Sequence, residues 1–284
     1  MTAPVVFAAV LAALQAPLRG EMAVTFGDLP LVSAEPLSQA TQDSVTGRLL
    51  GAVARHGVPA IGFVNERRLT DASGHPDSAM VRMLKRWLDA GFELGNHTYA
   101  HPDLHRTALA AYEADIIRGE AVTRRLVGAL GRTPRYFRHP FLHTGRSLAI
   151  RDSLQAFLDA HGYRVAPVTI DHSDYVFGRA FDLARARGNG AAATRVAESY
   201  LQYMDTVICF YEAQARAILG RQIPQVLLLH ASSLNARCST SSPPGSKREA
   251  TPWCRWTGRS PTRPTGRPIT TPGRRASHGC TAGP

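Results

Sequence analysis

Short apolar runs alternate along most of the chain with longer segments of helical periodicity. The runs that predict strands lie at 21–26, 59–65, 92–97, 135–141, 163–171 and 225–235. Apolar residues recurring every three or four positions predict amphipathic helices at 44–57, 78–91, 109–131 and 152–162. Such alternation of strands and helices is typical of a parallel sheet covered by helices, so the sequence predicts an α/β fold.

One long interval interrupts this rhythm. Residues 176–224 hold two helical patterns separated by Gly-Asn-Gly at 188–190. We interpret this interval as a helical insertion between two strands of the sheet. It contains the only cysteine outside the C-terminal tail, Cys209, whose apolar surroundings predict a buried thiol.

Polar residues recur where the predicted strands stop. These residues are Asp28, His97, Arg138, Asp171 and His230. In a parallel barrel the carboxyl ends of the strands gather at one face, which is where active sites lie. The sequence therefore predicts that these side chains form one cluster.

The pair His97 and His101 suggests metal binding. Two histidines four residues apart on a helical turn point the same way, and Asp28 could add a carboxylate. A divalent metal held by such a set, with positions left open, is a hydrolytic design. The pair alone is a weak signal, because two solvated histidines in a loop would read the same.

Five segments in order resemble the motifs of the NodB-like polysaccharide deacetylases. They are TFGDLP at 25–30, HTYAH at 97–101, RYFRHPF at 135–141, DHSDY at 171–175 and LLLH at 227–230. That family consists of metal-dependent carbohydrate esterases on a distorted (β/α)7 barrel. The resemblance covers residues 21–236, and it implies a hydrolase that removes N-acetyl groups from a polysaccharide or related glycan.

The resemblance also implies a metal site. Asp28, His97 and His101 match the family's metal ligands, and the donors suit Zn²⁺ while also accepting Co²⁺, Ni²⁺ or Mn²⁺. Pro140 and Phe141 match one wall of the substrate groove, and Tyr175 matches the other.

Three further residues match catalytic positions. His230 matches the general acid, Asp171 the acid that orients this histidine, and Arg138 the arginine that holds the catalytic base. Each also has a purely structural interpretation: Arg138 as the partner of a structural acid, Asp171 as a strand-end cap, and His230 as a core histidine.

The first motif departs from the family pattern. The family has two successive acids there, a general base and then a metal ligand, whereas this chain has Gly27 before Asp28. Glycine cannot accept a proton, and general base catalysis contributes about 10²–10⁴-fold to rates. We therefore expect weak activity, and the alternative is a catalytically inactive barrel that binds glycan.

The end of the chain differs in composition from the rest. Residues 237–284 contain no Leu, Val, Phe, Met or Tyr, and they hold nine of the 33 basic residues and one of the 22 acidic ones, so residues 1–236 carry a net charge of only +3. This composition predicts a disordered basic tail. We favour a shift of reading frame near Arg237, which would remove the last helix and strand of the barrel and leave a strand edge unpaired.

The basic tail also suggests a nucleic-acid binder, but only Trp253 and Trp256 interleave with its basic residues and the body has no nucleic-acid motif. We therefore expect a glycan partner and no nucleic acid. No apolar run reaches the roughly 18 residues of a transmembrane helix. Residues 1–16 resemble the apolar part of a signal peptide without its positive charges. This favours a secreted or periplasmic protein, with the cytoplasm as the alternative, and nothing in the sequence indicates an oligomeric state.

Overall fold

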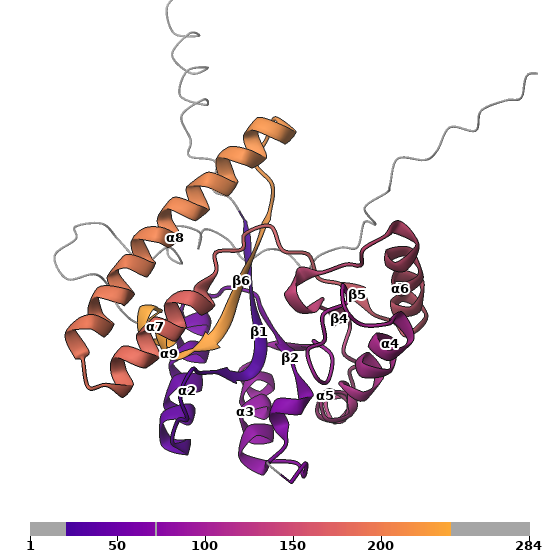
Figure 1. Ribbon diagram of the computed structural model, residues 1–284, viewed down its shortest axis with the longest axis horizontal. Helices are drawn as coiled ribbons and strands as arrows, with labels where there is room; N and C mark the ends of the chain where they lie inside the picture. The colour runs from indigo at the N-terminus through magenta and orange to yellow at the C-terminus, as the bar shows by residue number, and fades with distance from the viewer. Residues whose placement is uncertain (1–20, 72, 240–284) are drawn as a thin grey trace, which may run out of the picture.

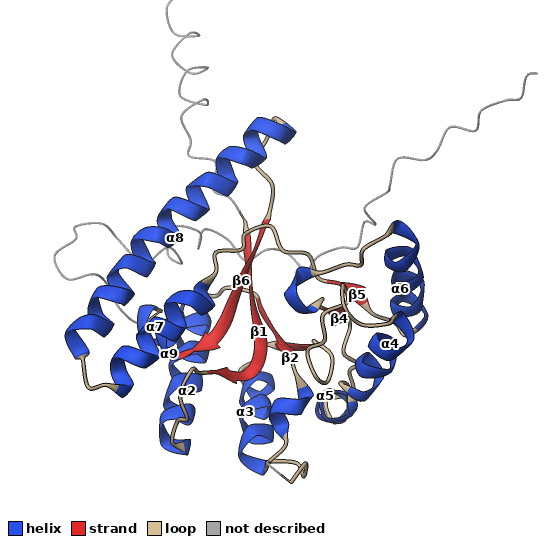
Figure 2. Ribbon diagram, viewed as in Figure 1, coloured by secondary structure: helices blue, strands red, loops and turns tan. Residues whose placement is uncertain are grey.

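The computed structural model describes residues 21–71 and 73–239. Six parallel strands form the centre of this part of the chain (Figure 2). The order of the strands across the sheet is β5-β4-β3-β2-β1-β6. The strands are β1 (Met22–Val32), β2 (Ala60–Val64), β3 (Glu93–Asn96), β4 (Tyr136–Phe137), β5 (Arg164–Val165) and β6 (Gln225–Ser232). The predicted α/β class is confirmed, and the curved sheet with its helices forms the incomplete barrel expected of the resemblance.

Helices flank the sheet on both sides in the view of Figure 1. Those nearest β1, β2 and β6 are α2 (Gln39–Arg55), α3 (Ser78–Asp89), α7 (Asp174–Ala186), α8 (Gly190–Leu219) and α9 (Ser233–Cys238), and those nearest β3 to β5 are α4 (Leu109–Arg118), α5 (Ala121–Gly128) and α6 (Leu148–Ala160). Two 3-10 turns, η1 (Glu66–Leu69) and η2 (Pro140–Leu142), follow β2 and β4. No helix in the described part of the chain is long and apolar enough to cross a membrane.

One segment links the two edges of the sheet. Residues 164 and 165 pair with β4, and the chain then crosses to β6, where Ile170 accepts a hydrogen bond from Leu228 N at 3.0 Å and donates one to the carbonyl of Val226 at 3.1 Å. Pro167 lies between these pairings and has no N–H to donate. The prediction of one continuous strand over 163–171 is therefore wrong, and the edge of β6 is paired at this point rather than open.

The buried apolar side chains form two clusters. The larger one covers the sheet next to α2, α3 and α8, and the smaller one includes Tyr112, Phe137, Leu158 and Tyr163 beneath α4 and α6. In the larger cluster Trp87 of α3 packs edge-on against Phe26 with ring centroids 5.1 Å apart. Aromatic side chains each bury about 150–250 Å², so such contacts supply much of the hydrophobic stabilisation.

The helix expected over 109–131 is broken in two. Helix α4 ends at Arg118 with Gly119 as its C-cap, and α5 starts at Ala121. A Cβ at Gly119 would overlap the carbonyl carbon of Thr98 and the backbone nitrogen of Tyr99. The break follows from this contact, because only glycine lets the loop 97–101 approach the helix end so closely.

The interval 176–224 is helical, as α7 and α8. Cys209 of α8 is exposed, so the prediction of a buried thiol is wrong. Helix α9 continues to Cys238, which is buried, so the ordered chain runs past the boundary expected at 237. The predicted signal segment 1–16 and most of the tail lie outside the described residues.

Replacement of Gly119 by alanine tests the contact between α4 and the loop. The added methyl group would overlap backbone atoms that cannot rotate away, so we expect Gly119→Ala to lower the free energy of unfolding by about 1–3 kcal/mol. Gly128→Ala is the matched control, because a Cβ there meets nothing within 4 Å. It should be neutral or stabilise by up to about 1 kcal/mol. Urea denaturation of both variants measures the difference, and equal effects would contradict the role of Gly119.

Candidate functional site

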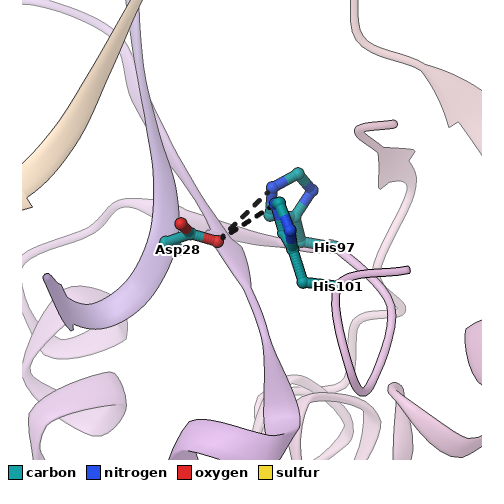
Figure 3. Close-up of side chains that lie close together, drawn as sticks. All are labelled: Asp28, His97 and His101. Carbon is teal, nitrogen blue, oxygen red and sulfur yellow. Dashed lines mark ion pairs between the residues drawn. The ribbon is translucent and has the colours of Figure 1, made fainter. Parts of the chain in front are cut away.

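A carboxylate and two imidazoles meet at the carboxyl ends of β1 and β3. Asp28 Oδ1 lies 3.7 Å from His97 Nε2 and 3.4 Å from His101 Nε2. Figure 3 shows both rings turned toward the carboxylate. The structure therefore brings together the three residues expected to bind a metal.

The position of Asp28 comes from an irregularity in β1. The register between β1 and β6 shifts after Gly27, and Asp28 has a left-handed φ of 55°. Aspartate tolerates this conformation better than most residues. Its Oδ2 lies 3.7 Å from Arg68 Nη2, a neighbour that the sequence analysis missed, whereas its buried Oδ1 has no hydrogen-bond partner.

The two histidines converge for a reason other than the one predicted. Residues 97–101 are not helical, and Thr98 and His101 instead have φ values of 66° and 57°. Asn96, buried at the end of β3, accepts a hydrogen bond from Thr98 N at 2.7 Å and donates to the carbonyl of Ile116 at 3.0 Å. A strand-end asparagine thus shapes the loop, and its place directly before His97 was the available sequence signal.

Both imidazoles favour the neutral form, which is the form that binds a metal. His97 is 4% exposed, and burial lowers its pKa to about 3 despite the attraction of Asp28. Burial likewise lowers the pKa of His101. The Nδ1 of His97 lies 2.8 Å from the carbonyl of Arg138, so this nitrogen carries the proton and Nε2 is free to bind.

The geometry fits a divalent cation. Bonds of about 2.0–2.1 Å in tetrahedral geometry place ligand atoms roughly 3.4 Å apart, and the two separations from Asp28 Oδ1 are 3.4 and 3.7 Å. Burial raises the pKa of Asp28, but electrostatic interactions with His97, His101 and Arg68 outweigh it. The net shift is downward, and the carboxylate is ionised at neutral pH. A cation would also supply the partner that Oδ1 lacks.

His230 is held by Asp174 and not, as predicted, by Asp171. Asp174 Oδ1 lies 2.6 Å from His230 Nδ1, and its Oδ2 accepts from His230 N at 2.7 Å. The left-handed residue Ser173 turns the chain so that Asp174, the first residue of α7, faces β6, while Asp171 only accepts a 3.4 Å bond from Ser173 N. Two acids three residues apart could not be told apart by spacing.

Each member of this pair favours the charged form of the other. Burial lowers the pKa of His230, but the Asp174 carboxylate outweighs it and the net shift is upward. Burial raises the pKa of Asp174, but His230 outweighs it and the net shift is downward. The raised pKa of His230 means that the pair stabilises the fold fully below the unfolded value of about 6.5 and loses this contribution as pH rises through the folded value. Asn235 of α9 completes the group by donating to Asp174 Oδ2 at 2.7 Å.

Arg138 lies inside the barrel, 1% exposed. It donates to the carbonyls of Ala166 and Pro167 and to Thr25 Oγ1, at 3.1, 3.3 and 3.1 Å. Among the described residues no carboxylate pairs with it, so the alternative of a structural acid partner is wrong. Burial lowers its pKa to about 10.

Gly27 faces His230. A Cβ built on Gly27 would lie 3.3 Å from both Cδ2 and Nε2 of His230 and 3.6 Å from Leu228 Cδ1. A side chain at this position would therefore enter the space beside the imidazole nitrogen that points away from Asp174.

The predicted groove residues lie on both sides of the cluster. Pro140 is buried, whereas Phe141 is 57% and Tyr175 60% exposed. The Phe141 ring lies 4.6 Å from that of His101, and the Tyr175 ring lies 6.3 Å from that of His230. Two exposed aromatic rings thus flank the polar centre.

The chain is similar in sequence to a family of known enzymes and to several of its members. A family model described as polysaccharide deacetylase matches residues 16–166. A chitin deacetylase of Colletotrichum lindemuthianum is 29% identical over 164 residues, 57% of this chain and 56% of that protein. A peptidoglycan-N-acetylglucosamine deacetylase of Bacillus cereus is 28% identical over 123 residues, 43% of this chain and 37% of that protein. This chain therefore corresponds to only part of either relative.

Solved structures show the same fold. A mutant of a CE4 family pseudoenzyme of Bacillus anthracis, described as having restored enzymatic activity, superposes with a TM-score of 0.50 at 17% identity. The match covers 78% of this chain and 60% of that one. The family model ends before Asp174 and His230, so these two residues rest on the structure described above.

Zinc titration tests the three-residue cluster. We expect His101→Ala to weaken Zn²⁺ binding by more than the roughly 10–100-fold that loss of an outer contact costs, because a ligand itself is removed. His161→Ala is the control, since this exposed histidine at the end of α6 lies outside the cluster. Isothermal titration after treatment with a chelator gives both affinities. Equal affinities in the two variants would remove His101 from the site.

The pKa of His230 in two variants identifies the acid that is its partner. We expect Asp174→Asn to lower the pKa of His230, because burial then acts without the anion that opposes it. Asp171→Asn should shift it less, since Asp171 does not contact the ring. Histidine NMR resonances followed against pH report both shifts. A larger shift in the Asp171 variant would reverse the assignment.

Proposed function

Because this chain belongs to the polysaccharide deacetylase family, we propose that its barrel binds an N-acetylated glycan and hydrolyses the acetamide slowly, with a divalent metal, preferably Zn²⁺. The observation that carries this proposal is the convergence of Asp28, His97 and His101 beside a histidine, His230, that is bonded to Asp174. A carboxylate with two neutral imidazoles also suits Co²⁺, Ni²⁺ or Mn²⁺. The names of the relatives support chitin-like and peptidoglycan-like polymers as the substrate class.

The chain's own residues would divide the chemistry as follows. A cation at Asp28, His97 and His101 would act as a Lewis acid toward the acetamide carbonyl. The exposed rings of Phe141 and Tyr175 would pack against the sugar on either side. The carbonyl of Arg138 keeps the Nε2 of His97 turned toward Asp28.

His230 is suited to the role of general acid. Asp174 holds its Nδ1 and favours the protonated ring, so Nε2 can donate a proton to the leaving amine. The side chain that would take a proton from the attacking water is absent at Gly27. The proposal is therefore a scaffold with its acid in place and its base missing.

A second candidate is a barrel that binds glycan without turnover. Gly27 is the specific observation that favours it, since general base catalysis contributes about 10²–10⁴-fold. Glycan binding without acetate release would support this candidate over slow hydrolysis. Under either candidate the polymeric substrate supports a location outside the cytoplasm, in the periplasm or medium.

Restoring a carboxylate at position 27 tests the proposal. We expect Gly27→Asp to release acetate from an acetylated chito-oligosaccharide with Zn²⁺ at least about tenfold faster than the unchanged chain, since general base catalysis is worth about 10²–10⁴-fold. The Cβ contact of 3.3 Å with His230 is tight but can be relieved by a small shift of the ring.

Two controls separate the carboxylate from other effects. Gly27→Asn has nearly the same shape without the charge, and Gly128→Asp adds the same charge at an exposed position. Neither should gain activity. Once folding of each variant is verified by circular dichroism, equal rates in Gly27→Asp and Gly27→Asn would contradict the assignment of the missing base.

A further inference from the structure

Arg138 is a buried cation whose donors are only partly used. A guanidinium has five N–H groups, and the partners of Arg138 are two carbonyls and a hydroxyl, all neutral. Its Nη1 is buried and has no hydrogen-bond partner. The Phe63 ring, 4.5 Å from the guanidinium carbon, adds an attractive contact but no acceptor. A buried charge in this state favours the arrival of an anion.

Gly27 lies on the side of β1 from which this anion would approach. Residues two apart in a strand point to the same face, so position 27 shares the face of Thr25, whose hydroxyl accepts from Arg138 Nη2 at 3.1 Å. A Cβ at position 27 would touch His230 at 3.3 Å. The positions of Thr25 and His230 thus place Gly27 between a guanidinium and an imidazole whose protonated form Asp174 favours.

We propose that a small monocarboxylate, such as formate or acetate, binds between Gly27 and Arg138. A carboxylate oxygen can accept from Nη1, because Nε and Nη2 already donate to Ala166, Pro167 and Thr25. Hydrogen bonds between ionised groups are the stronger ones. The close contact at position 27 restricts the ligand to one or two carbons. Asp28 opposes the anion, and Arg68 offsets part of that repulsion through its 3.7 Å ion pair with Asp28.

Solvent contacts the side chains around Gly27 but not the guanidinium. The side chains of Asp28, His101 and His230 are 14%, 25% and 18% exposed, whereas Arg138 is 1% exposed and its Nη1 is buried. Binding therefore requires a small displacement of the side chains that cover Nη1.

The bound carboxylate has a catalytic consequence that rests on the proposed function. It would accept the proton of the attacking water while the water oxygen bonds to the acetamide carbon. His230 gives its proton to the amine nitrogen as the carbon–nitrogen bond breaks, and the carboxylic acid returns its proton to His230. The sum is one water and one amide giving acetate, a proton and the amine, so the carboxylate is regenerated.

Thermal unfolding with formate tests binding. The full chain is heated in sodium formate and in sodium chloride of equal ionic strength, with EDTA present so that no metal can be what formate binds. We expect formate at about ten times its dissociation constant to raise the midpoint by roughly 2–4 °C beyond chloride. Gly27→Asn, whose side chain occupies the same place, should lose this difference, and Gly128→Asn should keep it.

The same formate effect in Gly27→Asn and the unchanged chain would overturn the site. If Gly27→Asn does not fold, ¹³C-formate NMR on the unchanged chain replaces it. Saturable line broadening that acetate relieves and chloride does not supports the site, and the absence of such broadening overturns it.

Acetate release with Zn²⁺ and formate separates this inference from the proposed function. We expect formate to accelerate the unchanged chain by at least about tenfold, as part of the 10²–10⁴-fold worth of a general base, and not to accelerate Gly27→Asp. An active Gly27→Asp beside an unchanged chain that neither binds nor responds to formate would reject the carboxylate site alone. Formate binding without acetate release in either protein would reject the proposed hydrolysis and leave the site standing.

Discussion

The contacts of Arg138 connect more parts of this structure than those of any other residue in the candidate site. Its guanidinium reaches Thr25 on β1 and the carbonyls of Ala166 and Pro167 on the segment that joins the two edges of the sheet. Its own carbonyl holds His97 at the end of β3. A single buried residue therefore connects the first strand and the closing segment through its side chain, and the loop 97–101 through its carbonyl. The cost is a buried positive charge without a carboxylate partner.

The sequence was sufficient for those parts of the fold and site that follow from periodicity and strand ends. Alternating strands and helices predict the parallel sheet, and strand-end residues predict that Asp28, His97, Arg138 and His230 meet. What the sequence could not supply depends on contacts between distant segments. The break of the helix at Gly119 reflects the backbone of Thr98, and the choice of Asp174 over Asp171 reflects a left-handed turn at Ser173. Neither contact has a local signature that outweighs helix periodicity or motif spacing.

The two halves of the candidate site are built differently. The half formed by His97 and His101 depends on a loop held by Asn96 and by Asp115, which accepts from Tyr99 N and Ala100 N at 3.0 and 2.9 Å. The half formed by His230 depends on Asp174 and Asn235, which tie α7 and α9 to β6. The contacts around His97 and His101 position only the loop that carries these two histidines. The contacts of Asp174 position His230 and also join two helices to the sheet.

This difference bears on how the missing base is interpreted. A charged pair that anchors two helices would persist in a barrel with no turnover, so the geometry of Asp174 and His230 does not by itself indicate catalysis. Oδ1 of Asp28 and Nη1 of Arg138 are buried without a hydrogen bond, which costs stability in the folded protein. The proposed cation would occupy the first position and the proposed carboxylate the second. The physical difference between a binding barrel and a hydrolase in this chain is therefore whether a proton acceptor occupies the space beside Gly27, between Arg138 and His230.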